Sequence, residues 1–90
     1  QQKYIAESEL ELNKAKRQFT DARNHVHLSN LAMDQSKEVL RITSNRFKQG
    51  LEQSKDLLYA ETQLNEKELE NLQAIFNYNF TLAYIKFLTR

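Results

Sequence analysis

Residues Arg46 to Leu51 read RFKQGL and hold the single glycine of a 90-residue sequence without proline. Glycine adopts a left-handed backbone conformation without strain, and it is therefore common just past the end of a helix. The basic residues Arg46 and Lys48 come before it, where they suit the negative end of a helix dipole. The stretch predicts that one helix ends near residue 49 and that the chain turns there.

Residues typical of a helix start follow this turn. Ser54 is expected to cap the second helix, and Asp56 would lie in its first turn, where a carboxylate meets the positive end of the dipole. The alternative is one continuous helix with Gly50 inside it, which costs about 1 kcal/mol relative to alanine and leaves an extremely long rod. We therefore predict two helices joined by a short turn.

Before the turn, a large apolar or aromatic side chain recurs at every seventh residue. A small residue follows three positions after each of the first six. Together these residues predict a packing seam along the first arm, with the large positions at Ile5, Leu12, Phe19, Val26, Met33, Leu40 and Phe47 and the small ones at Ser8, Ala15, Ala22, Ser29, Ser36 and Thr43. An unbroken heptad favours helices that supercoil around a partner. Serine and alanine bury little area in an ordinary two-stranded coiled coil, so we favour a closely packed antiparallel pair.

The second arm repeats the pattern less regularly. Its seam positions are Leu57, Leu64, Tyr78 and Ile85, with Ala60, Ala74 and Leu88 three residues on. Asn71 interrupts the first row, and Lys67 and Thr81 interrupt the second. From Leu69 onward apolar residues spread over more faces than one partner helix covers, so we expect further helices to pack there.

The predicted fold class is all-α, a long antiparallel helical hairpin. The first arm spans about residues 3–49, the turn 49–53 and the second arm about 54–90, as a single unit. Because the helical pattern runs to both ends, we expect the chain to be a piece of a larger protein, and in isolation we expect it to self-associate through its uncovered faces. Polar residues interrupt the apolar region 74–88, so we expect no direct contact with a bilayer.

Composition and spacing argue against catalysis and against several ligand classes. Thirteen basic and twelve acidic side chains are interspersed and give a net charge of +1, which predicts no nucleic-acid partner. The chain has no cysteine, and His25 and His27 stand two residues apart, pointing away from each other on a helix. We therefore predict no enzymatic activity, no metal site and no cofactor.

The residues around the turn resemble the signature of TolC-type outer membrane efflux proteins. That signature runs Arg, aromatic, two variable residues and Gly-Leu, then Asp-x-Leu, Ala-Gln/Glu and Leu. Here it is matched by Arg46, Phe47, Gly50 and Leu51, then by Asp56, Leu58, Ala60, Glu61 and Leu64, and further on by Tyr78, Asn79 and Leu88. The resemblance covers the second arm well, and the first arm mainly by its pattern.

This resemblance implies a place in a tripartite pump. The parent protein would be a homotrimer whose hairpins form a periplasmic α-barrel, the tunnel of an efflux or type I secretion channel in a Gram-negative bacterium. The turn would lie at the periplasmic tip and dock an adaptor protein, which joins the tunnel to an inner-membrane transporter.

Carried over to this chain, Gln49, Gly50 and Leu51 would form the docking tip. Asp56 would match an acidic position near the entrance constriction, and Arg46 would join polar links that hold neighbouring hairpins closed. Either charge could instead simply complement a helix end. Some members carry a second acid three residues after the first, where this chain has Tyr59.

Two other functions remain open on the sequence alone. The hairpin of a periplasmic adaptor has similar length, but its second arm should lead into a β domain rather than the aromatic-rich stretch 75–88. A generic structural coiled-coil scaffold would explain the heptads without the spacing around Gly50. A lipid-binding amphipathic bundle is disfavoured because the chain has no basic polar face.

Overall fold

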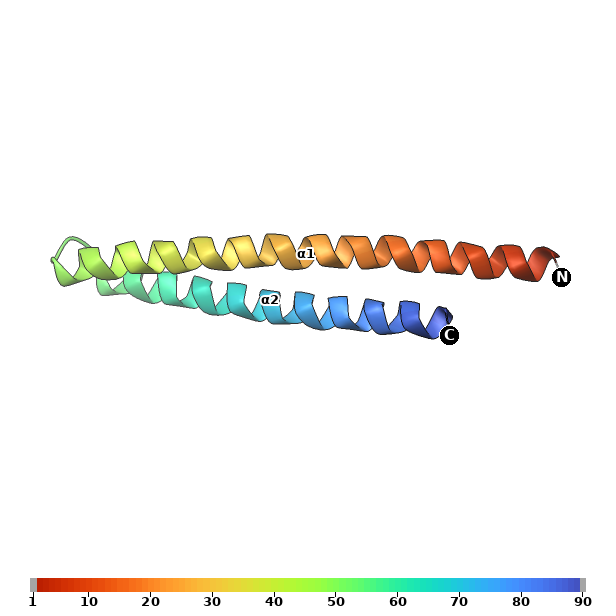
Figure 1. Ribbon diagram of the computed structural model, residues 1–90. Coiled ribbons are helices and arrows are strands. Elements are labelled where there is room, and N and C mark those ends of the chain that lie inside the picture. The colour runs from red at the N-terminus through yellow and green to blue at the C-terminus, as the bar shows by residue number, and fades with distance from the viewer. Residues whose placement is uncertain (1, 90) are drawn as a thin grey trace.

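The structure is a computed structural model that describes the backbone of residues 2–89 and the side chains of residues 9–89. It contains two helices, α1 (Gln2–Lys48) and α2 (Ser54–Leu88), packed side by side as an antiparallel hairpin (Figure 1). The molecule is a rod of 72 × 15 × 14 Å. The prediction of an all-α helical hairpin is confirmed.

The turn at Gly50 is built from backbone hydrogen bonds. The Leu51 amide donates to the Arg46 carbonyl at 2.8 Å, and the Gly50 amide donates to the Phe47 carbonyl at 3.0 Å. These two bonds form a Schellman motif, which needs a left-handed residue, and Gly50 has a φ of +75°. The glycine therefore ends α1 for the reason that the sequence suggested.

The start of α2 differs from the prediction that Ser54 caps it. Ser54 is the first helical residue, and the capping position belongs to Gln53, whose extended backbone has φ −85° and ψ 155°. The Gln53 carbonyl accepts bonds from the amides of Asp56 (3.1 Å) and Leu57 (3.3 Å), while its side chain makes no capping bond. Because the helix begins one residue early, the Ser54 hydroxyl lies past the position from which a cap can act.

The seam between the arms follows the heptad. Its small residues are the most buried, with Ala15, Ala22, Ala60 and Ala74 between 1% and 4% exposed. The large residues are half-buried: Leu12, Phe19, Val26, Met33, Leu40, Leu57, Leu64, Tyr78 and Ile85. The rings of Phe19 and Tyr78 pack across the seam with their centroids 5.1 Å apart. The backbones thus approach closely over alanine, and the larger side chains flank the contact.

The last large residue of the predicted seam, Phe47, is only partly covered by α2. Phe47 is 39% exposed, because Leu40 already lies beside Leu57 and Leu64 and the partner helix has no seam residue left opposite the last turn of α1. The side chain of Ile5 lies outside the described residues. Conversely, Asn71 and Thr81, which interrupt the pattern in the sequence, are buried in the seam.

Candidate functional site

The tip of the hairpin presents one apolar side chain to solvent. Leu51 is 61% exposed, and Gln49 and Gly50 beside it are exposed as well. A Cβ built on Gly50 would have no heavy atom within 4 Å. The structure therefore brings the three predicted docking residues together as an open, convex end.

The Arg46 side chain makes an ion pair within its own turn. Its Nε donates to Glu52 Oε1 at 2.8 Å, which ties the last turn of α1 to the connection. The spacing along the chain does not predict this pair, since its two residues are six apart and meet only because the chain reverses. Both side chains are partly exposed, so the pair is screened by water.

Asp56 lies in the first turn of α2 and is exposed. Its carboxylate is placed where the positive end of the helix dipole favours a negative charge. The position suits a helix-stabilising role. Tyr59, three residues after Asp56, is 67% exposed.

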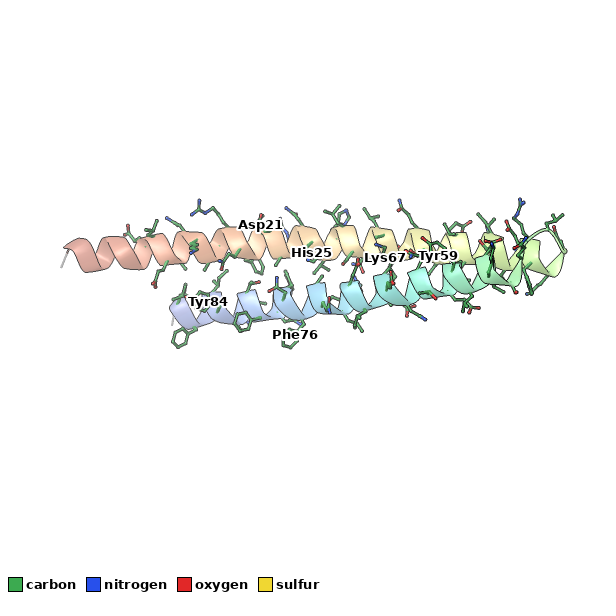
Figure 2. All side chains as sticks on the ribbon, turned by 180° about the vertical axis from the view of Figure 1, so that it is seen from behind. Asp21, His25, Tyr59, Lys67, Phe76 and Tyr84 are labelled. Carbon is green, nitrogen blue, oxygen red and sulfur yellow. The ribbon has the colours of Figure 1, made fainter. Side chains whose placement is uncertain are left out.

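The outer face of α2 carries a row of exposed apolar side chains, which we call the aromatic stripe. Its members are Leu69 (56% exposed), Phe76 (75%), Phe80 (64%) and Phe87 (66%). At 100° per residue, all four lie within about 40° of one another around the helix. Figure 2 shows Phe76 on the side of α2 that faces away from α1. The aromatic stripe is the part of the second arm for which the sequence predicted additional helices.

One side of the hairpin is hollowed over the small seam residues. One hollow, of about 470 Å³, lies over Ala22 and Thr81 and is bordered by Asp21, His25 and Phe80. Two others, of about 380 and 300 Å³, lie over Ala60 and Ala15. These hollows form where facing small side chains leave the space between two helices unfilled.

The described residues were also compared with the requirements of a metal site and of a membrane span. Within the described residues no group of three or more His, Cys, Asp or Glu could hold a metal ion. The Glu38 carboxyl has a lowered pKa because Arg41, one turn along the exposed face of α1, donates a hydrogen bond to it. Neither described helix has an apolar stretch long enough to span a bilayer.

No family model, no curated protein and no solved structure matches the chain.

Proposed function

We propose that this hairpin is part of the periplasmic tunnel of a TolC-type outer membrane efflux channel, and that its turn docks an adaptor protein. In this role the chain is not an enzyme. Its function is to form the wall of a conduit and to present a fixed contact point at the end of that wall.

The observation behind the proposal is the place of Leu51, an apolar residue that follows the turn glycine at the end of the rod. Its side chain is 61% exposed, so a partner that reaches the tip could bury apolar surface there. The Leu51 amide is held by the Arg46 carbonyl, and the neighbouring Arg46 side chain is held by Glu52. A backbone held by such bonds loses little conformational freedom on binding, which suits a docking point.

The surface of the hairpin supports assembly into a larger bundle. The solvent-accessible surface is 7265 Å², whereas a compact protein of this mass exposes about 5,500 Å². No large side chain among the described residues is fully buried, and the aromatic stripe is uncovered. Lateral neighbours, as in a tunnel wall, would cover this surface.

Under this proposal, Asp56 and Arg46 have roles at the tunnel entrance. Asp56 would face the constriction of the tunnel. Arg46 would contribute to closure mainly by fixing the turn through Glu52, since its Nε is occupied there at 2.8 Å. Its remaining guanidinium nitrogens would be the groups available to a neighbouring hairpin.

A substitution at the tip tests the proposal in the full-length parent protein. Leu51→Asp is expected to abolish efflux while the trimer remains intact, because it places a charge in an apolar contact. Leu10→Asp is the matched control: Leu10 is 65% exposed near the other end of α1, so the same change there should leave adaptor docking unaffected. Normal drug tolerance of the Leu51→Asp strain would refute docking through this residue.

A further inference from the structure

The middle of the seam contains a polar layer made of Asn71, Ser29 and Asn30. The Asn71 amide nitrogen Nδ2 donates to Ser29 Oγ at 3.0 Å and to Asn30 Oδ1 at 2.6 Å. Ser29 Oγ in turn donates to the Val26 carbonyl at 2.9 Å, so its lone pairs are free to accept from Asn71. Asn71 is 6% exposed and Ser29 7%. We call these three residues the Asn71 layer.

Asparagine at position 71 is expected to stabilise the seam less than an apolar residue would. Asn71 occupies the seam row that otherwise holds Leu57, Leu64, Tyr78 and Ile85. A leucine there would bury more apolar area and need no hydrogen-bond partner. A buried asparagine in such a seam is best known for making one helix alignment more favourable than the others.

The apolar pattern by itself does not fix the alignment of the two arms. Both arms repeat every seven residues, so a shift of α2 by one heptad again brings seam positions beside seam positions. Gly50 opposes such a shift, because the turn would move. The glycine would then enter a helix, at a cost of about fivefold in the equilibrium constant, and another residue would take the left-handed position, at a further cost of about five- to thirtyfold.

We propose that the Asn71 layer determines the register of the hairpin. A shift of one heptad in one direction would bring Asn71 beside Ala22 and Arg23, whose side chains accept no hydrogen bond. A shift the other way would bring it beside Ser36 and Lys37, which offer one acceptor in place of two. Only the observed alignment satisfies both hydrogens of the buried amide.

The Asn71 layer lies far from the turn. It lies 17 residues beyond the start of α2, or about 26 Å along the helix. The turn therefore fixes the alignment at one end of the rod, and the Asn71 layer fixes it near the middle. This assignment concerns the chain itself and does not rest on the proposed function.

Distance measurement between spin labels tests the proposal. Labels would be attached to cysteines replacing the exposed Arg17 and Glu68, in a chain with no cysteine of its own. These sites are offset by about 23 Å along the rod, so a one-heptad shift changes their separation by about 10 Å. The unmodified seam should give one narrow distance, measured with excess unlabelled chain to remove signals between molecules.

In this labelled chain carrying Gly50→Ala, so that no glycine favours the observed turn, Asn71→Leu is expected to add a second distance population of about a tenth of the molecules or more. Asn65→Leu is the matched control, because Asn65 is exposed on the same helix, and it should keep the single distance. A single unchanged distance in Asn71→Leu, with normal helix content by circular dichroism, would overturn the proposal.

A thermodynamic cycle gives an independent readout that does not require the shifted state to be visible. Removing both acceptors with Ser29→Ala and Asn30→Ala should raise the unfolding constant roughly tenfold when Asn71 is present, because its amide then stays buried without a partner. The same pair of changes should have little effect in the Asn71→Leu background. Equal effects in both backgrounds would contradict a coupled polar layer.

Discussion

The backbone amide of Leu51 donates a 2.8 Å hydrogen bond to the carbonyl of Arg46, so the exposed tip residue is fastened directly to the last turn of α1. The side chain of the same arginine reaches Glu52 on the other side of the glycine. Backbone and side chain of Arg46 thus hold the two residues that follow Gly50. Hydrogen bonds to the last turn of α1 therefore hold the residues of the tip.

Replacing Gly50 should destabilise the hairpin through the backbone alone. Gly50→Ala is expected to lower the free energy of unfolding by about 1 to 2 kcal/mol, because alanine is strained at a φ of +75°. Space is not the cause, since a Cβ there meets nothing within 4 Å. Thermal unfolding followed by circular dichroism measures the change. Gly50→Asn should cost less, and equal stability of Gly50→Ala and the original chain would contradict the left-handed cap.

Asp56 can be tested for its two roles separately. Asp56→Ala should cost the hairpin about 0.3 to 1 kcal/mol through the lost charge at the helix start. In the parent protein it should also make the closed entrance leakier, which single-channel conductance would detect. Glu61→Ala removes an exposed acid beyond the first turn and serves as the control. Unchanged conductance in Asp56→Ala would leave only the helix-stabilising role.

The Arg46 and Glu52 pair should contribute modestly and in a salt-dependent way. Glu52→Gln is expected to lower the free energy of unfolding by less than about 1 kcal/mol at low salt, because both side chains are partly exposed. The difference should shrink in high salt as the charges are screened. Chemical denaturation at two salt concentrations provides the measurement. A larger effect that persists in high salt would mean that Glu52 acts by packing rather than by charge.

The sequence was sufficient for the hairpin because its two main signals are local. Gly50 needs only its own backbone conformation to end α1, and the heptad needs only the spacing along one helix. The small seam residues, such as Ala22 and Ala74, are accordingly among the most buried in the molecule.

The features that the sequence did not predict depend on contacts between the arms, or on the helix beginning one residue earlier than expected. Asn71 looked like an interruption of the seam, since its partners Ser29 and Asn30 are 42 and 41 residues away and become visible only once the alignment is known. Ser54 was expected to cap α2, but the helix begins at Ser54 and moves the capping position to Gln53.

The aromatic stripe should drive lateral association of the chain. Replacing Phe76 and Phe87 with serine is expected to weaken self-association by at least tenfold, because each exposed ring is a large apolar area that a neighbour would cover. Helix content should be unchanged, since both rings point to solvent. Sedimentation equilibrium measures the association, with Leu28→Ser on α1 (62% exposed) as the control. Equal association of both variants would show that the stripe is not the contact.

The central claim, that the turn docks an adaptor, is tested most directly by disulfide cross-linking in cells. A cysteine replacing Leu51 in the full-length parent would be paired with cysteines placed along the hairpin tip of a candidate adaptor. If the tip docks the adaptor, a specific cross-link forms at position 51 and none forms when the cysteine is moved to Leu12 or Ile85. Cross-links only at those distant positions, or to no adaptor at all, would contradict docking through the tip and favour a generic coiled-coil scaffold.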